Sequence, residues 1–390
     1  MQQTSILTPV TGTLPPVAST GRFVALHSLR GLCAILVAVH NFEYPRNPFV
    51  LHSSLFVDFF FVLSGFVITH AYMLRLTTGN AFCVFIVRRF GRLWPLHVTM
   101  LFAFVCVDIV KIATRANFTV PPFTSPNSPI AIVANLLLVQ AVGVHTEVSW
   151  NVPSWSISIE FWTYILFALL CIPSKGKPPP LILTLTLALS AALVLLLFSP
   201  SYLETNSDYA MARCVYGFFV GHMVYRAAET KRWKIGGGSF LEATTILLVF
   251  VYVCVAEGII SLIAPVVFGL VVLLFAEESG QISKLLSTMP FVRLGDWSYS
   301  IYMVHWLVRG GISGVAKVLV ALIGIRSVTM RGPCDTHNCS WTMGALLAGY
   351  LVVVIIVASV TFKLIEQPGR RYFNRIAKNL AQHLSANRPH

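Results

Sequence analysis

Long apolar runs alternate with short polar connections along most of the chain. Between Phe23 and Leu364, runs of about 18 residues or more carry few charged side chains, and this is the length that a helix needs to cross a bilayer. Such runs must be helical, because the hydrocarbon core offers the backbone no hydrogen-bond partners. We predict about ten membrane-spanning helices, at residues 24–42, 55–74, 94–114, 154–172, 181–199, 209–226, 240–257, 259–276, 297–322 and 341–365.

One apolar stretch is shorter than the others. Residues 129–142 are too few for a span, so we predict a re-entrant or interfacial segment there. If this segment loops on the outer side, every connection rich in Lys and Arg falls on the same side as both termini, and the positive-inside rule makes that side cytoplasmic. The basic residues concerned are Arg75, Arg88, Arg89, Arg92, Lys175, Lys177, Arg226, Lys231, Arg232, Lys234, Lys284, Arg293, Lys363, Arg370, Arg371, Arg375 and Lys378.

Composition agrees with a membrane protein. Of the 390 residues, 56% are hydrophobic and 11% are charged, whereas a soluble domain has about 25% charged residues. Cytoplasmic connections account for the net charge of +13, so nucleic acid is not an expected partner. We expect an all-α polytopic membrane helix bundle at residues 22–373. A disordered cytoplasmic tail at 1–21 would precede it, and a basic cytoplasmic tail at 374–390 would follow.

Two of the eight cysteines lie in a polar connection rather than in an apolar run. Cys334 and Cys339 flank an outer loop that also holds His337. In an oxidising compartment they would form a disulfide, which is the pairing we favour. Free thiols and a zinc site remain open, although zinc would find only three ligands here. We predict no metal site.

Ionisable residues inside the apolar runs are few. Arg30 and His40 share the first span, Asp58 begins the second and Glu160 lies in the fourth. An unpaired charge in lipid is costly, so each of these residues carries a functional hypothesis. The predicted topology places His40, Asp58 and Glu160 in the outer half of the membrane. Arg30 and the arginines from 88 to 92 lie toward the cytoplasm.

These residue types suggest an acid–base group on one side and an anion site on the other. His40 could take a proton from a hydroxyl, with Asp58 or Glu160 orienting its ring. The alternative is an interfacial histidine held by a backbone carbonyl. Arg89 and Arg92 lie three residues apart and could bind phosphates of a nucleotide or, alternatively, of lipid headgroups. Ser64-Gly65 in the second span could allow another helix to approach closely. The alternative is a nucleophilic Ser64, but no base lies beside it in the sequence.

Six motifs, in order along the chain, resemble the acyltransferase-3 family of bacterial membrane O-acyltransferases. They are LHSLRGLCAILVAVHNF, FVDFFFVLSGFVI, RRFGRLWPLH, SWSISIEFW, LGDWSYSIYMVHW and IEQPGRRYF. The resemblance runs from about Leu26 to Phe373. It implies transfer of an acyl group, usually acetyl from acetyl-CoA as co-substrate, to a hydroxyl of a surface or exported glycan. The location implied is the bacterial inner membrane.

The resemblance also assigns roles to residues. Arg30 and His40 correspond to the family's functional Arg and His, and Arg89 and Arg92 to its coenzyme A pair. Tyr302 and His305, with Tyr299, stand in the SYSIYMVH segment and are candidates for binding substrate or coenzyme A.

One spacing departs from the family. Nine residues separate Arg30 from His40, where ten are common, and Asn41 takes the tenth place. Either the helix bulges, or His40 reaches the site from another angle, or Asn41 faces the site. The Asp often found before the Leu-Arg pair is Ser28 here.

A second function class remains. A transporter or flippase of glycans or lipid-linked sugars would also need about ten spans and buried charges. The paired broken helices of inverted repeats would mark a transporter, and no such repeat is visible. The expected partners are membrane lipids, acyl-CoA and a glycan acceptor. The sequence predicts no oligomeric state.

Overall fold

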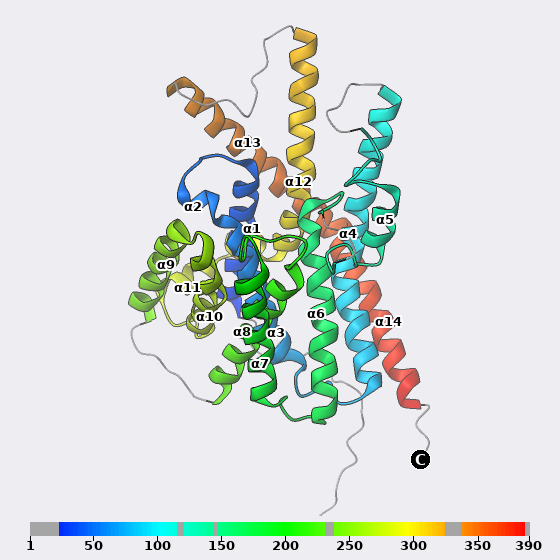
Figure 1. Ribbon diagram of the computed structural model, residues 1–390, viewed down its shortest axis with the longest axis vertical. Coiled ribbons are helices and arrows are strands. Elements are labelled where there is room, and N and C mark those ends of the chain that lie inside the picture. The colour runs from blue at the N-terminus through cyan, green and yellow to red at the C-terminus, as the bar shows by residue number, and fades with distance from the viewer. Residues whose placement is uncertain (1–22, 115–120, 144–146, 231–237, 324–336, 387–390) are drawn as a thin grey trace, which may run out of the picture.

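The computed structural model describes residues 23–114, 121–143, 147–230, 238–323 and 337–386, and in these ranges helices are the only regular secondary structure (Figure 1). The longer helices are α1 Val24–Phe42, α3 Phe56–Tyr72, α4 Gly79–Thr114, α6 Trp155–Cys171, α7 Leu181–Phe198, α8 Ala210–Thr230, α9 Gly238–Val255, α10 Ala264–Phe275, α12 Met289–Ile323, α13 His337–Thr361 and α14 Gln367–Ala386. The shorter ones are α2 Pro48–Leu51, α5 Pro129–Leu136 and α11 Gln281–Leu286.

The helices confirm an all-α, multi-pass membrane bundle. In the described ranges, eight segments are long and apolar enough to cross a bilayer. The other two predicted spans, 209–226 and 297–322, correspond to α8 and α12. Both are helices packed in the bundle, but they do not count among the eight. The total of ten therefore stays a prediction.

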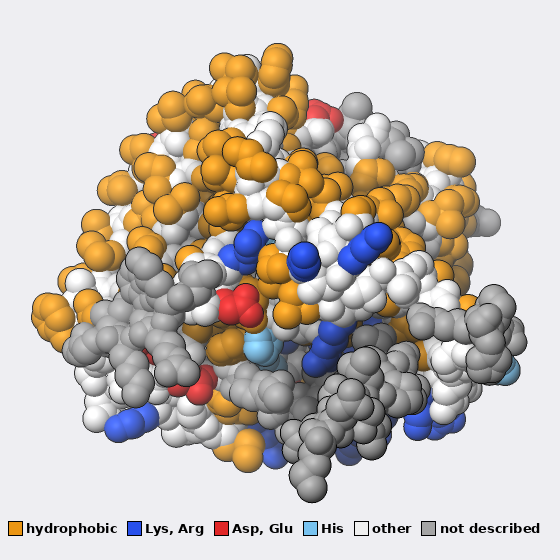
Figure 2. All heavy atoms as spheres, turned by 90° about the horizontal axis from the view of Figure 1, so that it is seen from below, with side chains coloured by type: hydrophobic (Ala, Val, Ile, Leu, Met, Phe, Trp, Pro, Cys, Tyr) orange, Lys and Arg blue, Asp and Glu red, His pale blue; other side chains and the backbone are white. Residues whose placement is uncertain are grey.

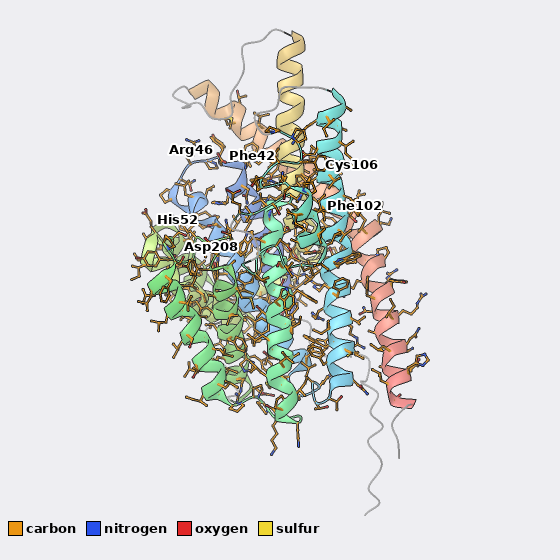
Figure 3. The ribbon with its side chains drawn as sticks, turned by 45° about the vertical axis from the view of Figure 1, so that its right-hand side comes forward. Phe42, Arg46, His52, Phe102, Cys106 and Asp208 are labelled. Atoms are coloured by element: carbon orange, nitrogen blue, oxygen red, sulfur yellow. The ribbon has the colours of Figure 1, made fainter. Side chains whose placement is uncertain are left out.

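Hydrogen bonds that join connections and helix ends from distant parts of the chain identify the two ends of the bundle. At one end, His52 Nδ1 lies 3.0 Å from the Val253 carbonyl oxygen and Leu203 N–H donates to Ser261 Oγ. Figure 3 shows Phe42, Arg46, His52 and Asp208 near this end. We call it the outer end.

At the opposite end, Arg226 donates to the Pro179 carbonyl, and Ala25 N–H donates to the Glu278 carboxylate. The connections 73–78, 172–180 and 276–288 lie here, and they include the basic residues Arg75, Lys175, Lys177 and Lys284. Lys and Arg side chains gather on the face seen from below in Figure 2. By the positive-inside rule we expect this end to be cytoplasmic, and we call it the inner end.

Helix α5 belongs to a re-entrant segment. It has eight residues, so it is about 12 Å long and cannot span a bilayer. Beyond it, the Leu138 carbonyl accepts hydrogen bonds from Ser158 Oγ and Trp162 Nε1 of α6. The segment therefore reaches the second turn of α6 and returns to the outer end.

Glycines set the closest helix pairs. A side chain at Gly31 would collide with the Leu294 backbone, so α1 and α12 pack backbone to backbone. Gly65 packs in the same way on Phe218, which joins α3 to α8. These pairs carry Arg30, His40, Asp58, Tyr302 and His305 to the centre of the bundle.

The C-terminal segment differs from the prediction. The expected boundary at residues 373 and 374 falls inside α14, and the basic tail is helical through Ala386. Phe373 packs on Gly91 and Gly369 on Pro95, so α14 lies along the inner half of α4. The predicted tail at 1–21 lies outside the described residues, as do Cys334 and the side chain of Cys339 with their possible disulfide.

Candidate active site

Arg30 is held between α1 and α12. Its Nε donates to Ser298 Oγ over 2.8 Å and its Nη2 to the Gly295 carbonyl over 3.2 Å. The charges of Arg92, Glu366 and Glu160 all act on it. Arg30 is therefore one member of an inner cluster of arginines and carboxylates.

Glu366 is a member of this cluster that stands in the IEQPGRRYF motif but was not predicted to be a site residue. It ends a π-helical segment, Phe362–Glu366, between α13 and α14, and only 2% of it is exposed. Ser300 Oγ donates to it over 2.8 Å, and it feels the charge of Arg92. No hydrogen bond joins Arg92 to another described residue, so this guanidinium is open to a ligand. Short π-helical segments often mark functional sites.

Arg89 is packed by aromatic rings. Its Nη2 donates to Tyr72 Oη over 3.2 Å, and its guanidinium lies 5.1 Å from the Tyr72 ring centroid and 5.9 Å from that of Tyr164. Tyr164 Oη donates to Glu160 over 2.6 Å and lies 2.8 Å from Ser64 Oγ. Glu160 and Ser64 therefore meet at the Tyr164 hydroxyl, and the ring of the same tyrosine lies beside Arg89.

This arrangement corrects the predicted roles of the two carboxylates. Asp58 is fully buried and receives Arg213 Nε at 3.0 Å and Nη2 at 2.7 Å on its two oxygens. Glu160 belongs to the inner cluster. The described contacts of Asp58 and Glu160 therefore do not orient His40. The prediction that one of them orients His40 used only the depth of each residue along its helix. Depth does not reveal which way a side chain faces.

His40 lies at the outer end of α1. Its Nδ1 is 2.9 Å from the Val50 carbonyl oxygen. Since a carbonyl only accepts, Nδ1 carries the proton and Nε2 keeps its lone pair. The backbone contact that would suit an interfacial histidine thus also presets the tautomer of a general base.

The structure narrows the alternatives for the unusual spacing. Helix α1 is regular from Val24 to Phe42, so there is no bulge. The side chain of Asn41 donates back to the Val37 carbonyl over 2.9 Å. Of the three alternatives, a different angle of approach for His40 fits best.

His305 is the ionisable neighbour of His40 on α12. It is fully buried, and its Nδ1 donates to the Tyr302 carbonyl over 2.7 Å. The two imidazoles interact electrostatically. Tyr302 Oη lies 2.9 Å from Ser156 Oγ, which connects α12 to the start of α6. Tyr302 and His305 therefore stand with His40 in an outer cluster, apart from the inner arginines.

The comparisons with known proteins can now be set beside this geometry. The sequence profile of the acyltransferase-3 family, described as an acyltransferase domain, matches residues 23–363. The chain belongs to this family. It is therefore a multi-pass membrane enzyme that transfers acyl groups other than aminoacyl groups.

Individual members of the family are distant from this acyltransferase. Acyltransferase MdmB of Streptomyces mycarofaciens is 25% identical over 351 residues, which cover 83% of this chain and 82% of MdmB. The proposed membrane-bound transacylase BcsY of Komagataeibacter xylinus is 24% identical over 361 residues, covering 90% of this chain and 83% of BcsY. Comparison with solved structures found no match.

Several residues of this acyltransferase's site were not predicted from the sequence. Ser298 and Ser300 stand in the SYSIYMVH region, where only aromatic and histidine positions drew attention. Tyr72 and Tyr164 lie in apolar runs, and no feature of the sequence singled them out. Within the described ranges, no group of three or more His, Cys, Asp and Glu side chains is arranged to hold a metal ion.

Proposed function

We propose that this acyltransferase moves an acetyl group from acetyl-CoA to a hydroxyl of a cell-surface or exported glycan, in the bacterial inner membrane. One observation carries the proposal. Arg30 and His40 stand on the same regular helix, about 15 Å apart along its axis. Arg30 belongs to the inner arginine cluster, and His40 to the outer histidine cluster. A cytoplasmic anionic donor and an outer hydroxyl acceptor fit this division.

Arg89 and Arg92 are the proposed phosphate ligands for the donor. Guanidinium groups bind phosphates through paired, charge-assisted hydrogen bonds. Arg92 has no hydrogen-bonding partner among the described residues, and the rings of Tyr72 and Tyr164 hold Arg89 in place. Coenzyme A carries several phosphates, so it is a natural ligand for this cluster.

His40 is the proposed general base. Its Nε2 would take the proton of the acceptor hydroxyl as the oxygen attacks the thioester carbonyl. The new ester bond forms, the carbon–sulfur bond breaks, and coenzyme A leaves as a thiolate that is then protonated. Transfer through an acyl-protein intermediate remains the alternative route.

A transporter is not retained as a second candidate. The family match covers residues 23–363 and is to an acyltransferase domain. The inner arginine cluster suits an anionic donor, and the outer histidine cluster suits a base.

Turnover by the purified protein in nanodiscs tests the proposal. With acetyl-CoA and pooled bacterial surface polysaccharide, we expect release of free coenzyme A and acetylated polysaccharide. His40→Ala should abolish transfer while acetyl-CoA still binds. Arg89→Ala should weaken acetyl-CoA binding. His222→Phe, on the inner half of α8 and outside both clusters, serves as the matched control. Transfer by His40→Ala at the wild-type rate would contradict the role of His40.

A further inference from the structure

Three buried side chains near the start of α6 share one hydrogen-bonding pattern. Asn151 Nδ2 donates to the Met303 carbonyl over 3.1 Å, and Gln140 Nε2 donates to the Ser154 carbonyl over 3.1 Å. His305 Nδ1 donates to the Tyr302 carbonyl. In each case a backbone carbonyl accepts the hydrogen bond that the side chain donates. This fixes the orientation of both amides and the tautomer of the ring.

The acceptor side of each group is left without a partner. Asn151 Oδ1, Gln140 Oε1 and His305 Nε2 are buried and make no hydrogen bond in the described part of the chain. Their residues are 1%, 5% and 0% exposed. Buried polar atoms are rarely left unpaired, because each costs the energy of its lost contact with water. Three acceptors of this kind on contacting segments call for a ligand that brings donors.

One buried donor nearby also lacks a partner, but it does not bond to any of the three acceptors. The indole N–H of Trp150 is also without a partner, but its ring packs with Phe123 and Leu101 in a separate apolar cluster. Polar groups on the same segments use their hydrogen bonds internally. Ser156 bonds to Tyr302, and Ser158 donates to the Leu138 carbonyl.

We propose that Gln140, Asn151 and His305 form the binding subsite for the hydroxyl groups of the acceptor. Hydroxyls donate hydrogen bonds, whereas phosphates and carboxylates would only add further acceptors. The subsite lies between the re-entrant segment, the start of α6 and α12, on the outer side of the bundle. It adjoins His40 through His305, so a polyhydroxylated acceptor held here would present one hydroxyl to that base. The inference rests on the proposed function and names its acceptor contacts.

The pantetheine arm of coenzyme A is the rival occupant, because its amides also bring N–H donors. Location favours the acceptor. The arginines proposed for the donor phosphates lie in the inner cluster, whereas Gln140 and Asn151 both lie on the re-entrant connection between α4 and α6, which starts and ends at the outer end. If the acceptor binds here, a variant of the subsite should weaken acceptor binding. If the pantetheine arm binds here, the same variant should weaken acetyl-CoA binding.

Asn151→Leu and Gln140→Met remove the acceptor atoms with little change of side-chain volume. In nanodiscs, with the polysaccharide pool as acceptor, we expect each variant to raise the half-saturating acceptor concentration about fivefold to tenfold. The affinity for acetyl-CoA, measured by titration, should stay within about twofold of wild type, which also shows that the variant is folded. Asn151→Leu releases the Met303 carbonyl as well, so Gln140→Met on a separate segment repeats the test independently.

His222→Phe is the matched control. His222 also has a buried Nε2 without a described partner, but it lies on the inner half of α8 among Phe167 and Phe219. We expect it to leave both substrate dependences unchanged. The inference is overturned if the two test variants weaken acetyl-CoA instead of the acceptor, or if they change neither. A wild-type enzyme that binds acetyl-CoA but acetylates no pool component would refute the proposed function itself, before any variant is made.

Discussion

Asp58 and Arg213 face each other between α3 and α8 with both side chains closed to solvent. Arg213 also donates hydrogen bonds to the backbone carbonyls of Ser54 and Thr205. A paired charge of this kind joins helices, and the pair is stable only while both partners are present. We therefore assign Asp58 to structure and not to acid–base chemistry.

Asp58→Asn should destabilise the protein by about 3–5 kcal/mol, because it leaves the Arg213 charge buried without compensation. Thermal unfolding in detergent measures the loss. The double variant Asp58→Leu with Arg213→Met should recover most of it. An Asp58→Asn protein with wild-type stability and no activity would instead return Asp58 to the catalytic residues.

Arg89→Lys tests the anion site. Lysine keeps the positive charge but loses the paired donors and the stacking on Tyr72 and Tyr164. We expect the KM for acetyl-CoA to rise about tenfold with little change in the acceptor KM, as measured by steady-state coenzyme A release. Arg75→Lys, in the connection between α3 and α4, is the control. An unchanged KM for acetyl-CoA in Arg89→Lys would argue for lipid headgroups as the ligand.

At the scale of single residues, the sequence indicated which residues are candidates for the site, but not which of them contact one another. Arg30, His40, Arg89 and Arg92 could be singled out because charge is rare in apolar runs. Their grouping depended on which way each helix faces, and no periodic signal in uniformly apolar helices reports that. Glu160 was therefore expected beside His40, but it lies with the arginines.

At the scale of helices, backbone contact at glycines decides which pairs pack closely. Gly65 of α3 and Gly221 of α8 each leave no space for a side chain against the facing backbone. The Ser64-Gly65 pair could be recognised in the sequence as a close-approach site, but the helix that approaches it could not. Close packing of small residues is a main source of helix association in lipid.

Gly65→Ala should separate α3 from α8, because the added methyl group meets the Phe218 backbone. We expect a marked fall in the unfolding temperature and in the yield of folded protein from detergent. Gly344→Ala in α13 is the control, since nothing lies within 4 Å of the added carbon. Equal stability of the two variants would contradict the packing described for α3 and α8.

Length and charge were enough to predict the re-entrant segment, because residues 129–142 are too few to span. Length and charge did not predict that α14 is a helix. Its basic residues suggested only a short basic tail, and the structure shows that this segment is a helix that lies along α4. The contact of Phe373 with Gly91 is between residues far apart in sequence, and helix patterns read locally do not show it.

At the scale of the whole molecule, the two ends of the bundle carry different chemistry. Arg30, Arg89, Glu160 and Glu366 belong to the inner cluster, whereas His40 and His305 stand in the outer cluster. The predicted topology placed Arg30 and the arginines from 88 to 92 toward the inner end and His40 toward the outer end, but it also placed Glu160 on the outer side, whereas Glu160 lies with the arginines. Under the proposed function, donor and acceptor would reach the reaction from opposite sides.

The Cys334–Cys339 disulfide stays a prediction that tests the outer location of that loop. In intact cells, a membrane-impermeant maleimide should label these two cysteines only after a reductant is added. A variant with both replaced by serine is the control for labelling elsewhere. Labelling without reductant would show free thiols, and labelling only after the cells are lysed would place the loop on the inner side.

The central claim is that acetyl groups pass from acetyl-CoA to a glycan hydroxyl. The most direct measurement follows isotope-labelled acetyl from acetyl-CoA into polysaccharide, with purified wild-type protein in nanodiscs and mass spectrometry of the product. The account predicts label in ester linkage to polysaccharide, removable by mild base, with one coenzyme A released for each acetyl transferred. Bound acetyl-CoA with no label in any glycan, under conditions where another family member is active, would contradict it.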